Sequence, residues 1–236
     1  PVISSAASDV YKRQSFKSFV SRVSKRLSLT KGENMILYSD RDNHYSHRVR
    51  IVLAEKDITC EIREFDTEDV SDEILAMSNT HQLPILVDRD LNLSDTGVIM
   101  EYLDERFPHP PLLPVYPVSR ASCRELMLRI DREWCPLVDQ ILNSRMTKKK
   151  EMQVKEELVQ QLATISPTFK EFAFFMNEDF TLVDCYLAPI LWRLPSMGIN
   201  LPYNKHLKPL LDYQAKLFDR PGFNDSLTTI ERDLKV

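Results

Sequence analysis

The chain has 236 residues, of which 43% are hydrophobic and 28% are charged, and its formal net charge is -4. This composition is typical of a globular protein with one or two domains, and its slight acidity excludes an overall basic field that would attract nucleic acid. We therefore expect no direct sequence-specific DNA binding. No stretch approaches the roughly 18 apolar residues of a membrane span, so we also expect no membrane partner. The four cysteines lack C-x-x-C spacing, which argues against a disulfide framework or zinc site and predicts a cytoplasmic chain with reduced thiols.

Residues 1–34 differ from the rest, with seven Lys or Arg against two acidic residues. Apolar side chains recur there at helical spacing, at Phe16, Phe19, Val20, Val23 and Leu27. This pattern allows a basic amphipathic helix for a membrane or nucleic acid. We favour a disordered basic leader, because short isolated helices are marginal in water. Residues 9–14 resemble a translated sequencing adapter and the first methionine is Met35, so we expect about the first 14 residues to be non-native.

After this leader, a short apolar run predicts a first strand over residues 35–39. Polar residues predict a turn at 40–43, and the apolar spacing that follows predicts a helix over 46–56. Partial alternation predicts a strand over 59–65, and a short helix follows over 70–77.

The segment after these elements contains Pro84 at the mouth of an apolar run, residues 85–88. Proline cannot donate to a strand ladder, so we expect a bend there, with a cis bond after Leu83 as one form. A second strand and a helix over 96–106 follow. The resulting order, βαβαββα, predicts an α/β thioredoxin-like N-terminal domain with a parallel crossover and a final hairpin.

Residues 107–117 contain five prolines in eleven residues, a density that no helix or sheet tolerates. We therefore place a proline-rich linker at 108–118, between a thioredoxin-like domain at 35–107 and an all-α domain at 119–236.

The C-terminal domain shows helical periodicity throughout. We expect helices over residues 120–143, 151–165, 182–194 and 206–218, with the basic run 148–150 as a solvated loop. Thr181 and Asp184 have the spacing of a capping box that begins a strongly apolar helix, and we assign them a structural role.

A thioredoxin-like half, a proline-rich linker and a helical half with this capping box together resemble the glutathione S-transferase superfamily. Within it, four longer strings resemble bacterial regulators that associate with RNA polymerase: residues 45–56, 99–112, 114–118 and 182–195. The resemblance covers the chain from Met35 onward. It implies a dimer, either a homodimer or a heterodimer with a paralogue, that contacts RNA polymerase holoenzyme through core and sigma surfaces under starvation or acid stress.

A glutathione transferase activates its thiol with a hydroxyl or cysteine at the start of the first helix, where the helix dipole also favours a thiolate. By the resemblance, that position falls at Asn43, whose amide is neither a nucleophile nor an acidic hydroxyl. Tyr45 and Ser46 are nearby hydroxyls that keep a catalytic alternative open. We favour structural roles for both, packing for Tyr45 and helix capping for Ser46.

Glutathione transferases also hold the glutamyl group of glutathione with an acidic or amide residue followed by serine. Here the corresponding pair is Asp95-Thr96, in which either residue would also serve as an N-cap. Leu83 and Pro84 remain, and the fold itself requires them. We interpret all four residues as a remnant of a ligand site, and we expect no bound cofactor, with glutathione as the alternative.

Pro108, His109 and Pro110, with Tyr116 beyond them, form the other candidate site. A rigid proline ridge loses little entropy on binding, and an imidazole and a phenol are suited to a protein interface. The alternative is a plain linker; the resemblance favours a partner-binding surface that acts in transcription activation. We expect no metal site, because His109 has no second ligand at useful spacing and the pair His44 and His47 lacks further partners.

The sequence thus predicts a non-enzymatic transcription regulator on a glutathione S-transferase-like scaffold. A glutathione-dependent transferase or thiol reductase using Tyr45 or Ser46 is the alternative. A purely structural dimerisation partner for a paralogue is a third, weaker hypothesis.

Overall fold

The computed structural model describes residues 35–234 except 67–68, 79 and 144, so the predicted basic leader at 1–34 lies outside the described residues. The N-terminal half follows the predicted order of elements. Its elements are β1 (Ile36–Asp40), α2 (His44–Glu55), β2 (Glu61–Phe65), α3 (Asp72–Leu75), β3 (Ile85–Asp88), β4 (Leu91–Leu93) and α4 (Thr96–Arg106).

The four strands form one mixed sheet in the order β2-β1-β3-β4. β1 pairs with β2 in parallel, and β3 pairs antiparallel with both β1 and β4, which gives the thioredoxin-like arrangement that the sequence predicts. β1 and β3 form the centre because their apolar runs are buried on both faces, whereas four of the five residues of β2 are exposed at the edge. α3 is shorter than predicted, since none of its residues is buried and no apolar face extends it.

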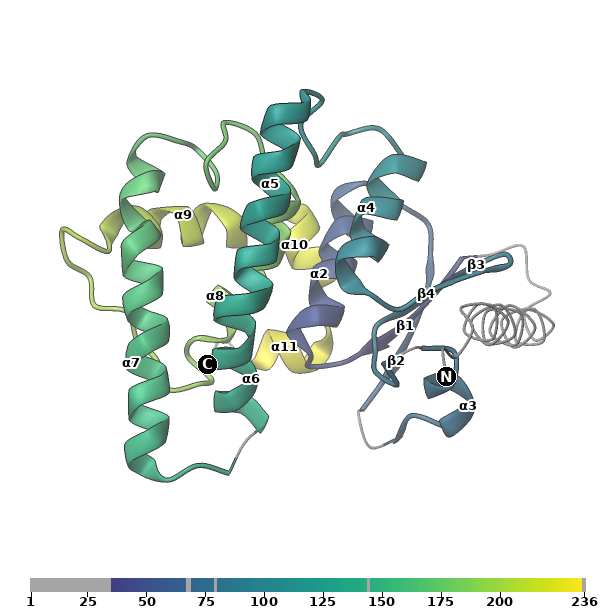
Figure 1. Ribbon diagram of the computed structural model, residues 1–236, viewed down its shortest axis with the longest axis horizontal. Helices are drawn as coiled ribbons and strands as arrows, with labels where there is room; N and C mark the ends of the chain where they lie inside the picture. Colours follow the sequence, from purple (N-terminus) through teal and green to yellow (C-terminus); the bar gives the residue numbers. More distant parts are fainter. Residues whose placement is uncertain (1–34, 67–68, 79, 144, 235–236) are drawn as a thin grey trace, which may run out of the picture.

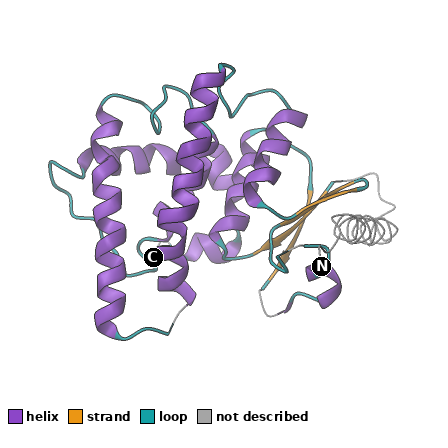
Figure 2. Ribbon diagram, in the orientation of Figure 1, coloured by secondary structure: helices purple, strands orange, loops and turns teal. Residues whose placement is uncertain are grey.

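The C-terminal half is helical, as Figure 2 shows. It consists of α5 (Pro117–Arg129), a π-helical turn η3 (Ile130–Trp134), α6 (Cys135–Asn143), α7 (Lys148–Ile165), a 3₁₀ turn η4 (Ser166–Lys170), α8 (Leu182–Arg193), α9 (Lys208–Phe218), α10 (Pro221–Ser226) and α11 (Thr229–Asp233). α2 and α4 stand between the sheet and this helical half (Figure 1). The two halves therefore share a core, in which α2 packs on α4, α8 and α10.

The helix that the sequence predicts over 120–143 starts earlier, at Pro117, inside the predicted linker. Proline is favoured at the first helical position, where its missing N–H is not needed. The helix widens into the π turn of η3 shortly before Pro136. Proline has no N–H to donate to the carbonyl of Arg132, and in an α-helix its ring would clash with that carbonyl. The amide of Cys135 accordingly reaches back to the carbonyl of Ile130, five residues earlier.

The prediction of a solvated loop at residues 148–150 is wrong, because these residues form the first turn of α7. The hydroxyl of Thr147 accepts the amide N–H of Lys150 at 3.3 Å and begins the helix there. Three lysines are tolerated in this turn because they are exposed.

The capping box that begins α8 is present. The Asp184 carboxylate accepts the Thr181 amide N–H at 2.7 Å, and the Thr181 hydroxyl accepts the amide N–H of Val183 at 3.3 Å. Asp184 is fully buried and also accepts the hydroxyl of Tyr213 at 2.6 Å and the amide N–H of Phe175 at 3.0 Å. Burial raises the pKa of Asp184 despite these hydrogen bonds. The box therefore fixes both the start of α8 and the position of α9.

A buried ionic cluster joins the C-terminal end of the chain to both halves. Both oxygens of the Glu231 carboxylate in α11 accept hydrogen bonds from Arg50 of α2 at 2.6 Å, and Arg193 of α8 forms a second ion pair with it. The three side chains are at most 2% exposed. Two arginines thus share one carboxylate, and the half-exposed carboxylate of Asp42 lies 3.6 Å from Arg193.

His47 lies against this cluster as a neutral imidazole. Its Nε2–H donates to Ser226 at 3.0 Å, and its Nδ1 accepts from Arg193 at 3.1 Å. Burial lowers the pKa of His47 well below 6.5, and the charges of Arg193 and Arg50 lower it further.

Removing the central carboxylate is expected to be strongly destabilising. Glu231→Ala leaves Arg50 and Arg193 buried without their shared partner, which costs about 3–5 kcal/mol of unfolding free energy. Urea denaturation measures the loss. Glu133→Ala is the control, because its ion pair with Arg129 is half-exposed and contributes at most about 1 kcal/mol. Equal losses in the two variants would contradict a structural role for the cluster.

Acid is expected to weaken the fold through His47. Below about pH 6.5 the unfolded chain binds a proton at this residue that the folded chain does not, so stability falls as the pH falls. The wild type should lose about 1.4 kcal/mol per pH unit more than His47→Gln, whose amide can keep both hydrogen bonds. Urea denaturation between pH 5 and pH 8 measures this difference. Parallel curves would show that His47 is not the titrating group.

Candidate functional site

Asn43 lies at the N-terminus of α2, where a thiol-activating group would stand. Its side-chain oxygen accepts the amide N–H of Tyr45 at 2.7 Å and that of Ser46 at 3.4 Å, so it is the N-cap of the helix. These two N–H groups are among those that a helix N-terminus offers to an anion. In this chain the Asn43 side chain already occupies them.

Tyr45 is partly buried, and its hydroxyl donates to the Asp139 carboxylate in α6 at 2.9 Å. Burial raises the pKa of Tyr45, and the negative charge of Asp139 adds to the effect. A phenol that gives its hydrogen bond to an internal carboxylate is poorly suited to stabilise a thiolate.

Ser46 is fully buried, and its hydroxyl accepts the amide N–H of Asp40 at 3.0 Å. The expected role in capping the helix is therefore wrong, since Asn43 is the cap. Ser46 instead fixes the turn between β1 and α2, and it has no exposed surface to offer a substrate.

Asp139 accepts a second hydrogen bond, from Nε2 of His44 at 2.9 Å. Burial lowers the pKa of His44 to about 4, so the imidazole is neutral and donates. Burial would raise the pKa of Asp139, but the hydrogen bonds from His44 and Tyr45 outweigh it and hold that pKa below its ordinary value. His44 and Tyr45, neighbours in α2, thus both donate a hydrogen bond to one carboxylate of the helical half.

Arg48, one turn further along α2, is also directed into the helical half. It is fully buried, donates to Asp131 at 2.6 Å and to Sγ of Cys135 at 2.8 Å, and lies over the ring of Tyr186 at 4.1 Å. Sequence reasoning missed Arg48, Asp131 and Asp139. The one available signal was a cation set among the apolar residues of α2.

The predicted ligand-site remnant is split between two places. The Leu83-Pro84 peptide bond is cis, and Pro84 is buried just before β3. Asp95 caps α4 by accepting the amide N–H of Val98 at 2.9 Å, and Thr96 is the first residue of that helix.

Asp95 also lines a hollow of about 640 Å³ between α4 and α5, with Gly97, Asp131 and Tyr186 in its walls. Gly97 is required there, because a Cβ atom would lie 2.7 Å from the Tyr186 hydroxyl. Of the residues that the sequence assigns to a site, only Asp95 lines this hollow.

The proline ridge, which we define as residues 108–110, is exposed in the connection between α4 and α5. The His109-Pro110 peptide bond is also cis. Tyr116, 77% exposed, lies in the wall of a groove of about 510 Å³ that continues from Pro111 to Met176. The groove that contains Tyr116 thus begins at Pro111, the residue directly after the ridge.

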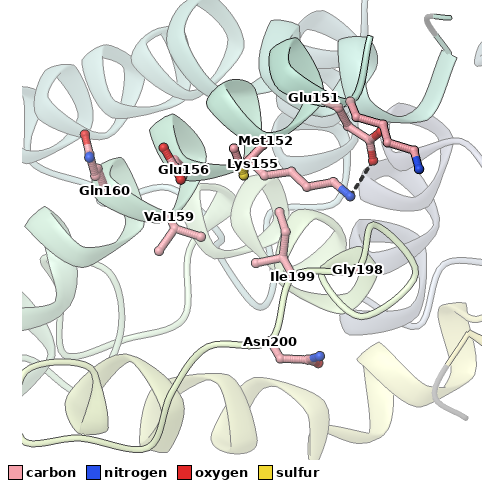
Figure 3. A pocket seen from close by; sticks show the side chains of 10 residues that line it. Glu151, Met152, Lys155, Glu156, Val159, Gln160, Gly198, Ile199 and Asn200 are labelled. Carbon is pink, nitrogen blue, oxygen red and sulfur yellow. Dashed lines mark ion pairs between the residues drawn. The ribbon is translucent and has the colours of Figure 1, made fainter. Parts of the chain in front are cut away.

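A further groove, of about 600 Å³, runs between α7 and residues 198–200 (Figure 3). Its charges are mixed, and Lys155 forms an ion pair with Glu151 at 2.6 Å. No predicted site residue lies there.

Among the described residues, no group of three or more His, Cys, Asp or Glu side chains is arranged to hold a metal ion. No helix within the described residues is long and apolar enough to cross a membrane.

Comparison with known proteins defines the class. Residues 37–111 match the family model of the glutathione S-transferase N-terminal domain, and residues 126–221 match that of the C-terminal domain. A tau-class glutathione S-transferase from Mangifera indica superimposes with a TM-score of 0.73 at 22% identity, covering 86% of this chain and 96% of that one. A glutathione S-transferase from Rhodospirillum rubrum has a TM-score of 0.73 at 25% identity, covering 86% and 100%. The fold is that of the glutathione S-transferase superfamily.

Curated relatives narrow this class. The stringent starvation protein A homolog of Coxiella burnetii is 47% identical over 201 residues, which cover 85% of this chain and 95% of the relative. The homolog from Pasteurella multocida is 43% identical over 193 residues, covering 82% and 90%. The chain belongs to the stringent starvation protein A family.

The assignment of Asn43 as a helix cap can be tested directly. Asn43→Ala should lower the unfolding free energy by about 1 kcal/mol, whereas Asn43→Ser, whose hydroxyl can still accept from the helix, should stay close to wild type. Urea denaturation separates the two variants. Equal stability in Ala and Ser would show that the cap contributes nothing.

Proposed function

We propose that the protein is a non-enzymatic, cytoplasmic transcription regulator that binds RNA polymerase holoenzyme through the proline ridge and Tyr116. It acts under starvation or acid stress by protein contacts and needs no bound cofactor. The observation that carries the proposal is the contrast between two surfaces. The side chains around the thiol position are hydrogen-bonded within the protein, whereas residues 108–111 and Tyr116 are exposed.

The ridge surface has the character of a protein-binding site. Tyr116, Val115 and Val118 are each at least 77% exposed, and Met176 on the far side of the groove is 53% exposed. Exposed apolar and aromatic side chains that gather on one surface are typical of interaction sites. Proline restricts the backbone and so reduces the entropy lost on binding.

The state of the thiol position supports a non-enzymatic role. Asn43 occupies the N–H groups of the helix, Tyr45 donates to Asp139, and Ser46 is buried. Neither Tyr45 nor Ser46 therefore offers a free hydroxyl to a thiolate, and Asn43 has an amide in place of one.

A dimer is part of the proposal. Val98 on α4 is 51% exposed and Leu128 on α5 is 46% exposed, and both line the hollow between these helices. Packing the thioredoxin-like half of one chain against the helical half of another would cover them. A second copy or a paralogue could be the partner.

A glutathione-dependent enzyme is the rival, favoured by the hollow beside Asp95. One structural neighbour, Ure2p in complex with glutathione, has a TM-score of 0.74 at 15% identity. For this chain, binding of glutathione in that hollow would need a donor to the thiol other than the groups described at the start of α2.

Binding to purified RNA polymerase holoenzyme, measured by surface plasmon resonance, tests the proposal. His109→Ala and Tyr116→Ala should each weaken binding about tenfold, a loss of about 1.4 kcal/mol that is typical of a residue with an above-average share of an interface. Tyr203→Ala is the matched control, because Tyr203 is 75% exposed but lies in the loop before α9.

Equal binding by the His109, Tyr116 and Tyr203 variants would exclude the ridge as the polymerase site. Turnover of an electrophile by the wild type in the presence of glutathione would contradict the non-enzymatic role and support the rival.

A further inference from the structure

The linker that carries the ridge is held in place from inside the protein. It has no helix or strand between α4 and α5, yet it contains Leu112 and Leu113, which are both only 3% exposed. Two buried charged side chains lie directly beneath it. Lys56, the C-cap of α2, has a fully buried side chain, and that of Asp104 in α4 is 6% exposed.

The Lys56 ammonium makes two contacts with different elements. Its Nζ lies 2.7 Å from Oδ1 of Asp104 and donates to the carbonyl oxygen of Pro110 at 2.5 Å. The second contact is with the ridge itself, because Pro110 is its last residue. Burying a lysine ammonium under a surface loop costs desolvation free energy unless the charge is paired and hydrogen-bonded.

Asp104 continues the network along the linker. Its Oδ1 accepts the amide N–H of Leu112 at 2.8 Å, and its Oδ2 accepts the amide N–H of Leu113 at 3.1 Å. The carbonyl of Leu112 in turn accepts the amide N–H of Leu182, the first residue of α8. α2, α4 and α8 are therefore all bonded to the four residues that follow His109.

The ridge cannot hold itself in this way. Pro108, Pro110 and Pro111 have no N–H, and the side chains of residues 108–111 are exposed. The backbone direction at the end of the ridge thus depends on what binds the Pro110 carbonyl and the two amides after it. Lys56 provides the first contact directly, and Asp104, which Lys56 neutralises, provides the other two.

We propose that Lys56 is a positioning residue for the partner-binding ridge, acting without touching the partner. Its ammonium fixes the Pro110 carbonyl and holds Asp104 in place to fix the amides of Leu112 and Leu113. This inference rests on the proposed function of the ridge. The alternative is that the ion pair only joins α2 to α4, and in that case the shape of the ridge would not respond to it.

The test uses the double variant Lys56→Met/Asp104→Asn. Lys56→Met alone would leave the Asp104 carboxylate buried without its cation, whereas the double variant contains no unpaired charge. The matched control is Glu55→Gln/Arg220→Met. Glu55 is the neighbour of Lys56 in the chain, and its ion pair with Arg220, at 2.6 Å, joins α2 to the start of α10 away from the linker.

Two measurements are made on each variant: hydrogen exchange of the Leu112 and Leu113 amides, and affinity for purified RNA polymerase holoenzyme. The double variant should exchange these amides at least tenfold faster and bind at least tenfold more weakly. The control should stay within twofold of wild type in both.

Unchanged exchange in the double variant would overturn the proposal. Faster exchange with unchanged affinity would also overturn it if His109→Ala weakens binding as expected, because the ridge would then bind the polymerase without its contacts to Lys56 and Asp104. Wild-type affinity in His109→Ala would instead overturn the proposed function, and the exchange rates alone would still decide whether Lys56 shapes the linker.

A check on the wild type remains informative even if the double variant does not fold. By NMR, the ammonium protons of Lys56 should exchange with water at least tenfold more slowly than those of Lys208, whose ion pair with Asp212 is exposed. Equal rates would show that Lys56 does not make the buried contacts on which the proposal depends.

Discussion

The Glu231 carboxylate is the single group on which the arrangement of the two halves depends most. It lies in the last described helix, yet it binds Arg50 from the first helix and Arg193 from the central helix of the other half. Each arginine would be costly to bury alone, so both halves rely on the C-terminal end of the chain for a partner to a buried charge. The relative position of the sheet and the helical half follows from this requirement.

A second set of contacts between the halves involves the start of α2, the place where a glutathione transferase activates its thiol. In a thiol-using relative, polar groups there must remain available to a substrate. Here His44, Tyr45 and Arg48 are all turned toward the helical half and bound to its side chains. A side chain that bonds one half to the other is not free to bind a ligand between them. The same residues therefore cannot both join the two halves and contact a thiol substrate.

Local signals predicted most of the fold. The bounds of α4 were predicted to the residue, because Asp95 and Thr96 begin a clear apolar period. The parallel pairing of the first two strands and the hairpin of the last two followed from chain connectivity, whereas the pairing of β1 with β3 at the centre of the sheet was not predicted. The start of α7 was missed, because three lysines suggested a loop although Thr147 is a good cap.

The candidate site was harder to predict. Asp139 and Glu231 are surrounded by ordinary helical sequence, and their partners lie 95 and 181 residues away in the chain. No local period can indicate a contact over such a separation. The burial of Lys56 likewise leaves no local signal, since it arises only when the linker folds over it.

The π turn at Ile130–Trp134 determines in which direction the side chains of α6, the helix that continues from it, point. A turn that holds one extra residue rotates the later side chains by about 100° relative to an uninterrupted α-helix. With this rotation, Asp139 faces His44 and Tyr45 and bonds to both. Pro136, which follows this turn and favours its wider spacing, thereby sets through helical geometry which side of α6 faces α2.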